Sequence, residues 1–132
     1  MNLISFNPAS EFVLASCSHD NTVKVWNVQK PDQSLTYAGG NDPCLSLEWN
    51  WNGSLLGSVW KDKMLRILDP RVNKTVVEAK SHEGAKSQKF SWLGEDYCLS
   101  VGFSKDMHRQ YFLWDTKNFE KPYISKFKLF VI

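Results

Sequence analysis

The stretch SHDNTVKVWN, residues 18–27, combines a polar turn with a short strand pattern that closes on a large aromatic residue. Two later stretches have the same plan: WKDKMLRILD at residues 60–69 and SKDMHRQYFLWD at residues 104–115. In all three, an aspartate in the turn precedes apolar positions of the kind that form a short strand. The chain therefore contains a repeated supersecondary unit.

The spacing of this repeat is nearly constant. The turn aspartates lie 42 and 44 residues apart, and the residues at the strand ends lie 42 and 46 residues apart. The two sets are Asp20, Asp62 and Asp106, and Trp26, Leu68 and Trp114. A period of about 40–45 residues with a Trp-Asp-like dipeptide is typical of a propeller blade with four antiparallel strands.

Each repeat divides into four short strands. In the first repeat the expected strands are LISF, FVLASC, TVKVWNV and SLTY, and NPAS supplies turn residues between the first two. Many of these runs are apolar on both faces, which fits sheets covered by a neighbour on each side. We predict an all-β fold of about three four-stranded antiparallel blades, which is an incomplete propeller. The predicted domain covers residues 1–132, with repeats at approximately 1–38, 42–80 and 82–128.

The composition excludes several classes of protein. Hydrophobic residues make up 42% and aromatic residues 14% of the 132 positions, which is a globular rather than a disordered composition. A formal net charge of +2 gives no argument for nucleic-acid binding. The three cysteines lie far apart in apolar runs, as expected for buried free thiols. Without a membrane-length apolar run or a signal-peptide pattern, the sequence predicts a soluble intracellular chain.

No pattern in the sequence predicts catalysis or metal binding. The three histidines have no metal-ligand spacing with each other or with a cysteine. Ser16 and Ser58 lie on the second strands of their repeats, where a structural role explains them. The Gly-containing stretch AGGND, residues 38–42, lacks the Lys-Ser/Thr pair of a phosphate-binding loop. We therefore expect no enzyme activity, no metal and no cofactor.

The repeats resemble the WD-repeat family, whose WD40-type blades contain a buried network of Trp, Ser or Thr, His and the turn Asp. The resemblance implies that the network residues here are Trp26, Ser16, Asp20, Ser58, Asp62, His82, Asp106 and Trp114. The network is partial in the first repeat, whose His position would precede Met1, and broken in the second, where Leu68 replaces the tryptophan. We expect Trp26 and Trp114 to be buried.

A narrower resemblance is to the coronins, propeller proteins that bind actin filaments. It is carried by WNWNGSLLGSVWKDKMLRILDPR at 49–71, SHEGAKSQKFSWL at 81–93 and VGFSKDMHRQYFLWDTKNFEKP at 101–122. The match runs from about residue 3 to residue 122, and the tail at 123–132 departs from it. Because coronins have seven blades, the resemblance covers three central blades only and implies part of a longer protein or a truncated product. Three blades cannot close a ring, so we expect exposed blade faces and self-association through them.

The resemblance to coronins also implies a cytoplasmic, cytoskeleton-associated protein whose partner is the actin filament. A generic WD-repeat scaffold for another protein complex is the alternative. Positively charged residues near the turns of the second and third repeats are candidates for partner binding. These residues are Lys61, Lys63, Arg66, Arg71, Lys105 and Arg109. The competing interpretation is that they are ordinary solvated charges, or that Arg66 and Arg109 pair with carboxylates such as Glu78.

Overall fold

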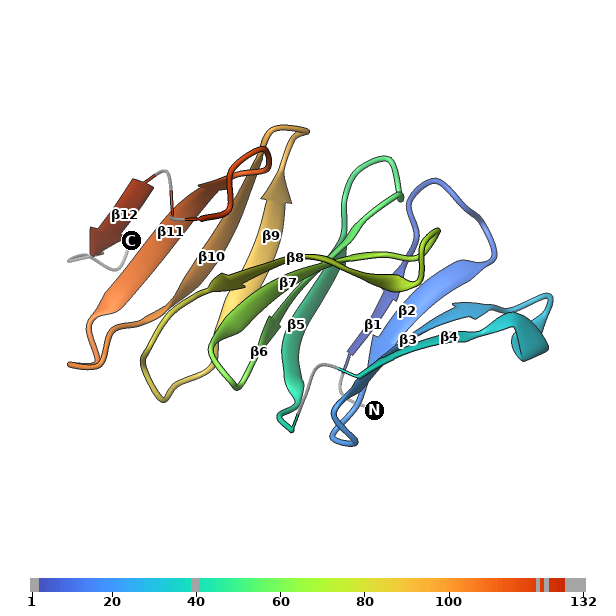
Figure 1. The fold of residues 1–132 in the computed structure, drawn as a ribbon, viewed down its shortest axis with the longest axis horizontal. Coiled ribbons are helices and arrows are strands. Elements are labelled where there is room, and N and C mark those ends of the chain that lie inside the picture. Colours follow the sequence, from blue (N-terminus) through green and yellow to red (C-terminus); the bar gives the residue numbers. More distant parts are fainter. Residues whose placement is uncertain (1–2, 39–40, 121, 123, 128–132) are drawn as a thin grey trace.

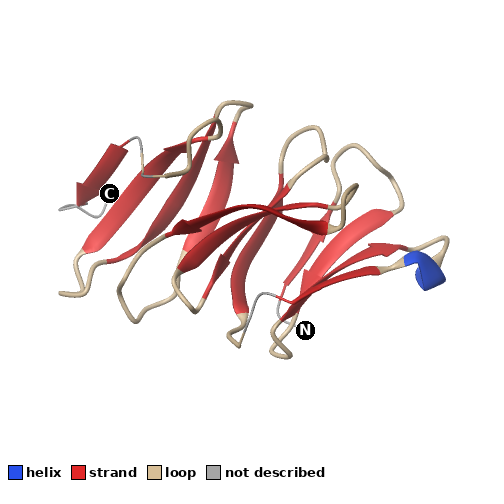
Figure 2. Ribbon diagram, in the orientation of Figure 1, coloured by secondary structure: helices blue, strands red, loops and turns tan. Residues whose placement is uncertain are grey.

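The computed structural model describes residues 3–38, 41–120, 122 and 124–127. Within them the chain forms three four-stranded sheets and a short 3-10 helix, η1, at Pro31–Gln33 (Figures 1 and 2). Blade one contains β1 (Leu3–Phe6), β2 (Val13–Cys17), β3 (Thr22–Asn27) and β4 (Leu35–Ala38). Blade two contains β5 (Cys44–Trp49), β6 (Leu56–Trp60), β7 (Met64–Asp69) and β8 (Lys74–Lys80). Blade three contains β9 (Lys89–Leu93), β10 (Tyr97–Phe103), β11 (Arg109–Asp115) and β12 (Ile124–Phe127).

Each blade is an antiparallel meander, because consecutive strands of each sheet are hydrogen-bonded neighbours. The three blades lie side by side in chain order, and the first strand of blade two, β5, contacts both β1 and β9 (Figure 1). The predicted all-β class with three four-stranded blades is confirmed. Of the tail at 123–132, only the backbone of β12 is described; residues 123 and 128–132 lie outside the described residues.

The turn between the second and third strands has the same backbone geometry in all three blades. The residue after the turn aspartate has a positive φ in every case: 65° at Asn21, 70° at Lys63 and 64° at Met107. This left-handed conformation reverses the chain tightly and disfavours residues with a side chain. Its recurrence at one position of each repeat shows that the aspartates mark structurally equivalent turns.

Two hydrophobic cores lie between the blades. The core between blades one and two includes Val23, Val25, Leu56, Trp60 and Leu68. The core between blades two and three includes Val59, Leu65, Ile67, Phe90, Cys98 and Trp114. Successive side chains of a strand point to opposite faces of its sheet, so β6 and β7 contribute alternately to the two cores. This explains why the sequence of blade two is apolar on both faces.

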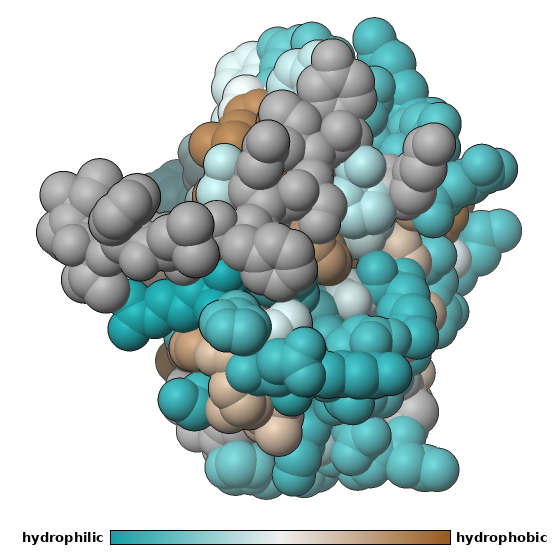
Figure 3. Space-filling view, turned by 90° about the vertical axis from the view of Figure 1, so that its left-hand side faces the viewer, coloured by the Kyte–Doolittle hydropathy of each residue, from teal (hydrophilic) through white to brown (hydrophobic). Residues whose placement is uncertain are grey.

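The two outward faces of the stack expose apolar side chains. On blade one, Ile4 is 48% exposed and Phe6 is 71% exposed, and both lie on the face opposite to the first core. On blade three, Leu93, Tyr97 and Val101 are 46%, 37% and 40% exposed. Figure 3 views the molecule from the end where blade three lies, and apolar atoms (brown) are visible there between hydrophilic ones (teal). Both ends of the stack therefore offer apolar surface to a partner.

Candidate functional site: blade networks and the loop rim

Blade three contains a buried polar network around His82. The indole Nε1 of Trp114 donates a hydrogen bond to Ser100 Oγ at 2.9 Å, and this Oγ lies 3.0 Å from Nε2 of His82. The other imidazole nitrogen, Nδ1, lies 3.2 Å from Gln110 Oε1. The imidazole also stacks on the ring of Phe112, with 4.1 Å between centroids. His82, Ser100 and Trp114 have no exposed surface, so the network connects the segment before β9 with β10 and β11 from inside the blade.

The structure corrects the assignment of Asp106 to this network. Asp106 is exposed in the turn between β10 and β11, and the acceptor at His82 is Gln110 instead. The turn is longer than in the other blades, which carries the aspartate away from the imidazole. Ser100 was not predicted as a network residue. Its position indicates this role, because Ser100 follows Ser58 by 42 residues, as Ser58 follows Ser16.

Burial favours a neutral imidazole at His82. Because an amide oxygen can only accept, Nδ1 carries the proton that is donated to Gln110, and in the neutral form Nε2 then accepts from the hydroxyl of Ser100. Burial lowers the pKa of His82 because the charged form is poorly solvated inside the blade, and the hydrogen bonds to Gln110 and Ser100 only partly oppose this. The residue therefore acts as a neutral hydrogen-bonding link.

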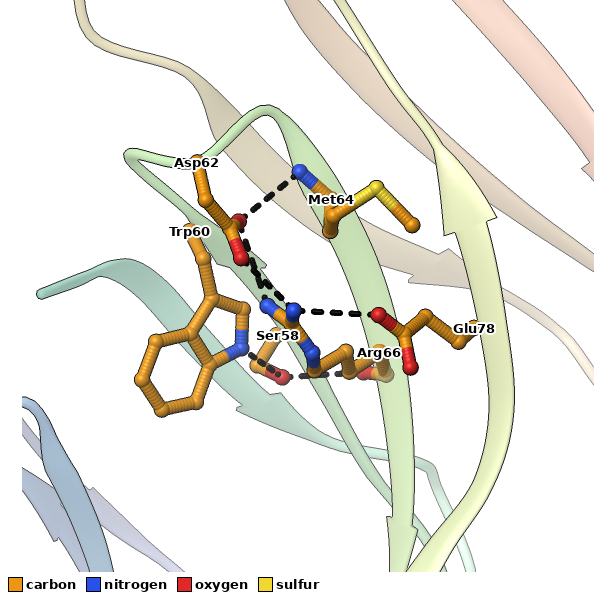
Figure 4. Close-up of polar contacts among 6 residues, drawn as sticks. All are labelled: Ser58, Trp60, Asp62, Met64, Arg66 and Glu78. Atoms are coloured by element: carbon orange, nitrogen blue, oxygen red, sulfur yellow. Dashed lines mark hydrogen bonds and ion pairs between the residues drawn. The ribbon is translucent and has the colours of Figure 1, made fainter. Parts of the chain in front are cut away.

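Blade two replaces the missing tryptophan with one from another strand. Leu68 occupies the tryptophan position on β7, opposite Leu56, and Trp60, the last residue of β6, packs at the other end of the same core. Trp60 Nε1 donates to Ser58 Oγ at 2.9 Å, and Ser58 in turn donates to the backbone carbonyl of Arg66 at 2.9 Å (Figure 4). The serine thus keeps an indole partner, although the indole comes from its own strand.

Arg66 forms the centre of a charged network in blade two. Its guanidinium bonds both carboxylate oxygens of Asp62, at 3.1 and 2.6 Å, and Glu78 Oε1 at 3.0 Å, and lies 5.3 Å from the ring centre of Trp60 (Figure 4). Asp62 also accepts from the backbone amide of Met64, which fixes the turn. Burial alone would lower the pKa of Arg66, but its bonds to Asp62 and Glu78 raise it overall.

Blade one has the serine and tryptophan of the network. Trp26 Nε1 donates to Ser16 Oγ at 2.9 Å, and Trp26 is half-buried because it faces away from blade two. Trp114, in contrast, is completely buried as expected. Asp20 accepts from both the hydroxyl and the amide of Thr22, and these bonds hold the pKa of its carboxyl below the ordinary value. The aspartates of blades one and two therefore stabilise their turns rather than contact a histidine.

Two tryptophans that were not predicted as site residues connect the blades. Trp49, at the end of β5, donates from its indole to the carbonyl of Ser5 in blade one at 3.0 Å. Trp92, near the end of β9, makes the same contact with the carbonyl of Glu48 in blade two, also at 3.0 Å. The signal in the sequence is their spacing, since Trp92 follows Trp49 by 43 residues, which is one repeat length. The first strands of neighbouring blades are thus fastened by an equivalent hydrogen bond.

The six candidate partner-binding residues do not form one surface. Lys61, Lys63 and Lys105 lie in the turns between second and third strands, and Arg109 begins β11 at the same rim. Arg71 follows β7, so it lies at the opposite rim, where it pairs with Asp69 at 2.8 Å. Arg66 is buried and belongs to the charged network described above. We call the rim with the turns at 61–63 and 104–108 and the segment 81–88 the loop rim.

The hydrogen-bonded histidine and serine of blade three are not arranged like a catalytic site. His82 and Ser100 are hydrogen-bonded, but both are fully buried, and the group at Nδ1 is an amide instead of the orienting carboxylate of a hydrolase. Among the described residues there is no group of three or more His, Cys, Asp or Glu that could hold a metal ion. All three cysteines are buried free thiols, and no helix in the described part of the chain is long and apolar enough to span a membrane.

The fold and the networks define a class, the WD-repeat propeller proteins. The family model "WD domain, G-beta repeat" matches residues 2–27. Among solved structures, the WD40 domain of Toxoplasma gondii coronin superposes with a TM-score of 0.90 at 34% identity, covering 96% of this chain and 33% of that chain. U3-55K superposes with a TM-score of 0.72 over 92% of this chain and 35% of that chain, but at 18% identity this shows the fold alone.

The particular relatives within this class are coronins. The chain is 39% identical to the coronin-like protein of Saccharomyces cerevisiae over 94% of its length and 37% identical to coronin-like protein crn1 of Schizosaccharomyces pombe over 92%. It is 32% identical to human coronin-7 over 95% of its length. The three blades are therefore homologous to a segment of the coronin WD-repeat region. The chain spans about a fifth of the two yeast relatives (19% and 20%) and 14% of human coronin-7.

Proposed function

We propose that this chain is a non-enzymatic, protein-binding WD-repeat segment whose partner is the actin filament. The observation that carries the proposal is the similarity to coronins along more than nine-tenths of the chain. The similarity covers all three blades, so it supports a role shared with the coronin segment that this chain matches. A cytoplasmic location in association with the cytoskeleton follows from the same proposal.

The arrangement of polar residues supports a binding role rather than a catalytic one. The residues that would be needed for acid–base chemistry, such as His82, are enclosed within blade three and hold strands together. The chemically accessible groups are the charged side chains of the turns, which meet a partner through electrostatic complementarity. A blade stack with exposed loops is therefore a rigid support for a protein-binding surface.

Co-sedimentation with actin filaments tests this proposal. We expect a saturable fraction of the 132-residue chain to pellet with filaments, after subtraction of what pellets without them. A matched control is the three-blade segment of U3-55K that superposes on this chain, because it shares the fold at only 18% identity. The proposal is wrong if the chain stays in the supernatant, or if the control segment pellets with filaments to the same extent.

A further inference from the structure

A groove on the loop rim has an unusual concentration of positive charge. It lies between the turn of blade two at 61–63 and the segment at 84–88 that enters blade three, and it has a volume of about 330 Å³. Its lining includes Lys61, Lys63 and Lys86 but no aspartate or glutamate. Lys86 was not predicted as a candidate, because only the fold brings it opposite the turn of the preceding blade.

Two carboxylates near the groove, Asp62 and Glu83, are already paired with other cations. Asp62, between the two turn lysines, is bonded by the guanidinium of Arg66. Glu83 is paired with Lys80 at 2.6 Å and with Lys105 at 3.3 Å. Within the part of the chain that the structure describes, no ion pair involves any of the three groove lysines. The groove therefore has a local excess of positive charge, although the whole chain carries only +2.

Backbone hydrogen bonds hold both walls of the groove in place. The turn wall is fixed because Lys61 N donates to Pro43 O at 3.0 Å and Ser81 N donates to Lys63 O at 2.7 Å. The opposite wall is fixed because Gly84 N donates to Phe103 O at 2.7 Å. At Gly84 the backbones approach so closely that an added Cβ would lie 2.5 Å from that same oxygen.

Side-chain contacts complete this wall. Gln88 Nε2 donates to the carbonyl of His82 at 2.8 Å, and the ammonium of Lys86 lies 4.9 Å from the ring centre of Phe103. The backbone of the groove is thus formed before any partner arrives, so only its lysine side chains need to adjust to bind.

We propose that this groove binds a carboxylate-rich segment of a partner protein. Lysine ammonium groups pair with carboxylates, and a narrow groove with several of them suits an extended acidic peptide better than a flat surface. The groove lining contains no aromatic side chain on which a base could stack, which argues against single-stranded nucleic acid. This inference goes beyond the proposed function, because it concerns a binding surface and does not require the partner to be actin.

The test measures binding of a fluorescein-labelled hexaglutamate peptide to the 132-residue chain by fluorescence anisotropy at low ionic strength. We expect the triple variant Lys61→Glu, Lys63→Glu and Lys86→Glu to bind the peptide at least roughly tenfold more weakly than the unchanged chain. The control is Lys30→Glu, Lys74→Glu and Lys117→Glu, three exposed lysines at the opposite rim. Both variants change the net charge from +2 to −4. The control should therefore bind the peptide more tightly than the groove variant, although the same change in net charge weakens binding in both.

Three outcomes would overturn the proposal. The first is no binding of hexaglutamate by the unchanged chain, and the second is an equal loss in both triple variants, which would indicate non-specific attraction. The third is groove-dependent binding of phosphatidylserine vesicles with no binding of the peptide, which would assign the groove to a lipid surface. Circular dichroism of all variants, together with the milder triple variant in which the same lysines become alanine, separates loss of binding from loss of the fold.

Discussion

His82 connects the strands of blade three from a buried position that disfavours its charged form, which makes the stability of the fold sensitive to pH. Its pKa in the folded chain is lowered by burial, whereas in the unfolded chain it has the ordinary value of about 6.5. Below that pH the unfolded chain binds a proton at His82 more readily than the folded chain does, which lowers the free energy of unfolding. The contribution of His82 is therefore complete above about pH 6.5 and is lost as the pH falls through the lower, folded-state pKa.

We expect the free energy of unfolding of the unchanged chain to fall as the pH decreases from 7 to 5, measured by urea denaturation. The variant His82→Gln should be less stable at pH 7 but should show a shallower decrease over this range. Carboxylates with a lowered pKa, such as Asp69 and Glu83, respond mainly at more acidic pH, so they do not mask the effect. Equal slopes in the two proteins would show that His82 titrates normally.

Arg66 and Arg71 differ in burial although both pair with aspartate. The Arg66 side chain is 10% exposed and has two carboxylate partners, whereas the Arg71 side chain is 69% exposed. Arg66→Ala should reduce the free energy of unfolding by about 2 kcal/mol, because it removes a largely buried guanidinium that connects two carboxylates, Asp62 and Glu78. Arg71→Ala should cost less than about 1 kcal/mol, because the Arg71 side chain is mostly in water and Asp69 keeps the hydrogen bond from the backbone amide of residue 71. If the two variants lose the same stability, the network in blade two has no special role.

At the scale of strands and turns, the blades are joined through the carbonyls of their first strands. Trp92→Phe keeps an aromatic ring of smaller volume and removes the N–H that bonds Glu48 O, and Trp49→Phe does the same at Ser5. Each change should lower the free energy of unfolding by about 1 kcal/mol in thermal or urea denaturation. The control is Trp51→Phe, at a side chain that is 59% exposed. An equal effect of Trp51→Phe would contradict the role given to the inter-blade bonds.

The strands and their grouping could be predicted because they depend on local patterns. The repeat length and the turn aspartates identify the blades, and the positive φ at Asn21, Lys63 and Met107 shows that the alignment of the turns is correct. The exchange of partners inside the blades could not be predicted in this way. Position 68 is a leucine, and the sequence alone does not show that Trp60 supplies the indole that bonds Ser58 instead, because this depends on which side chain reaches the core.

The sequence did not predict correctly which candidate partner-binding residues share a surface, because this also depends on the three-dimensional arrangement. Arg66 and Arg71 are close in sequence to Lys61 and Lys63, and sequence proximity suggested a common surface. In a meander of short strands, however, ten residues take the chain from one rim of the blade to the other, and alternate residues point into the core. Arg71 therefore reaches the opposite rim, while Lys86, from the next blade, completes the groove.

At the scale of the whole molecule, both ends of the stack expose apolar residues on a sheet face. We propose that the chain self-associates through these faces, and we expect sedimentation velocity to show oligomers that increase with protein concentration. Phe6→Ser should weaken the association, since Phe6 is 71% exposed on the outward face of blade one. Trp51→Ser is the control, because Trp51 is also exposed but lies in a turn. A chain that is monomeric at all concentrations would contradict this expectation.

The stacking of three blades around buried indole–serine bonds is the basis for every function proposed above. Hydrogen exchange of the tryptophan indole N–H groups, followed by nuclear magnetic resonance, tests it most directly. The indoles of Trp60 and Trp114, fully buried and bonded to Ser58 and Ser100, should exchange slowest, whereas that of Trp51 should exchange within the dead time of the measurement. Exchange of the Trp60 and Trp114 indoles as fast as that of Trp51 would mean that the blades do not stack as described.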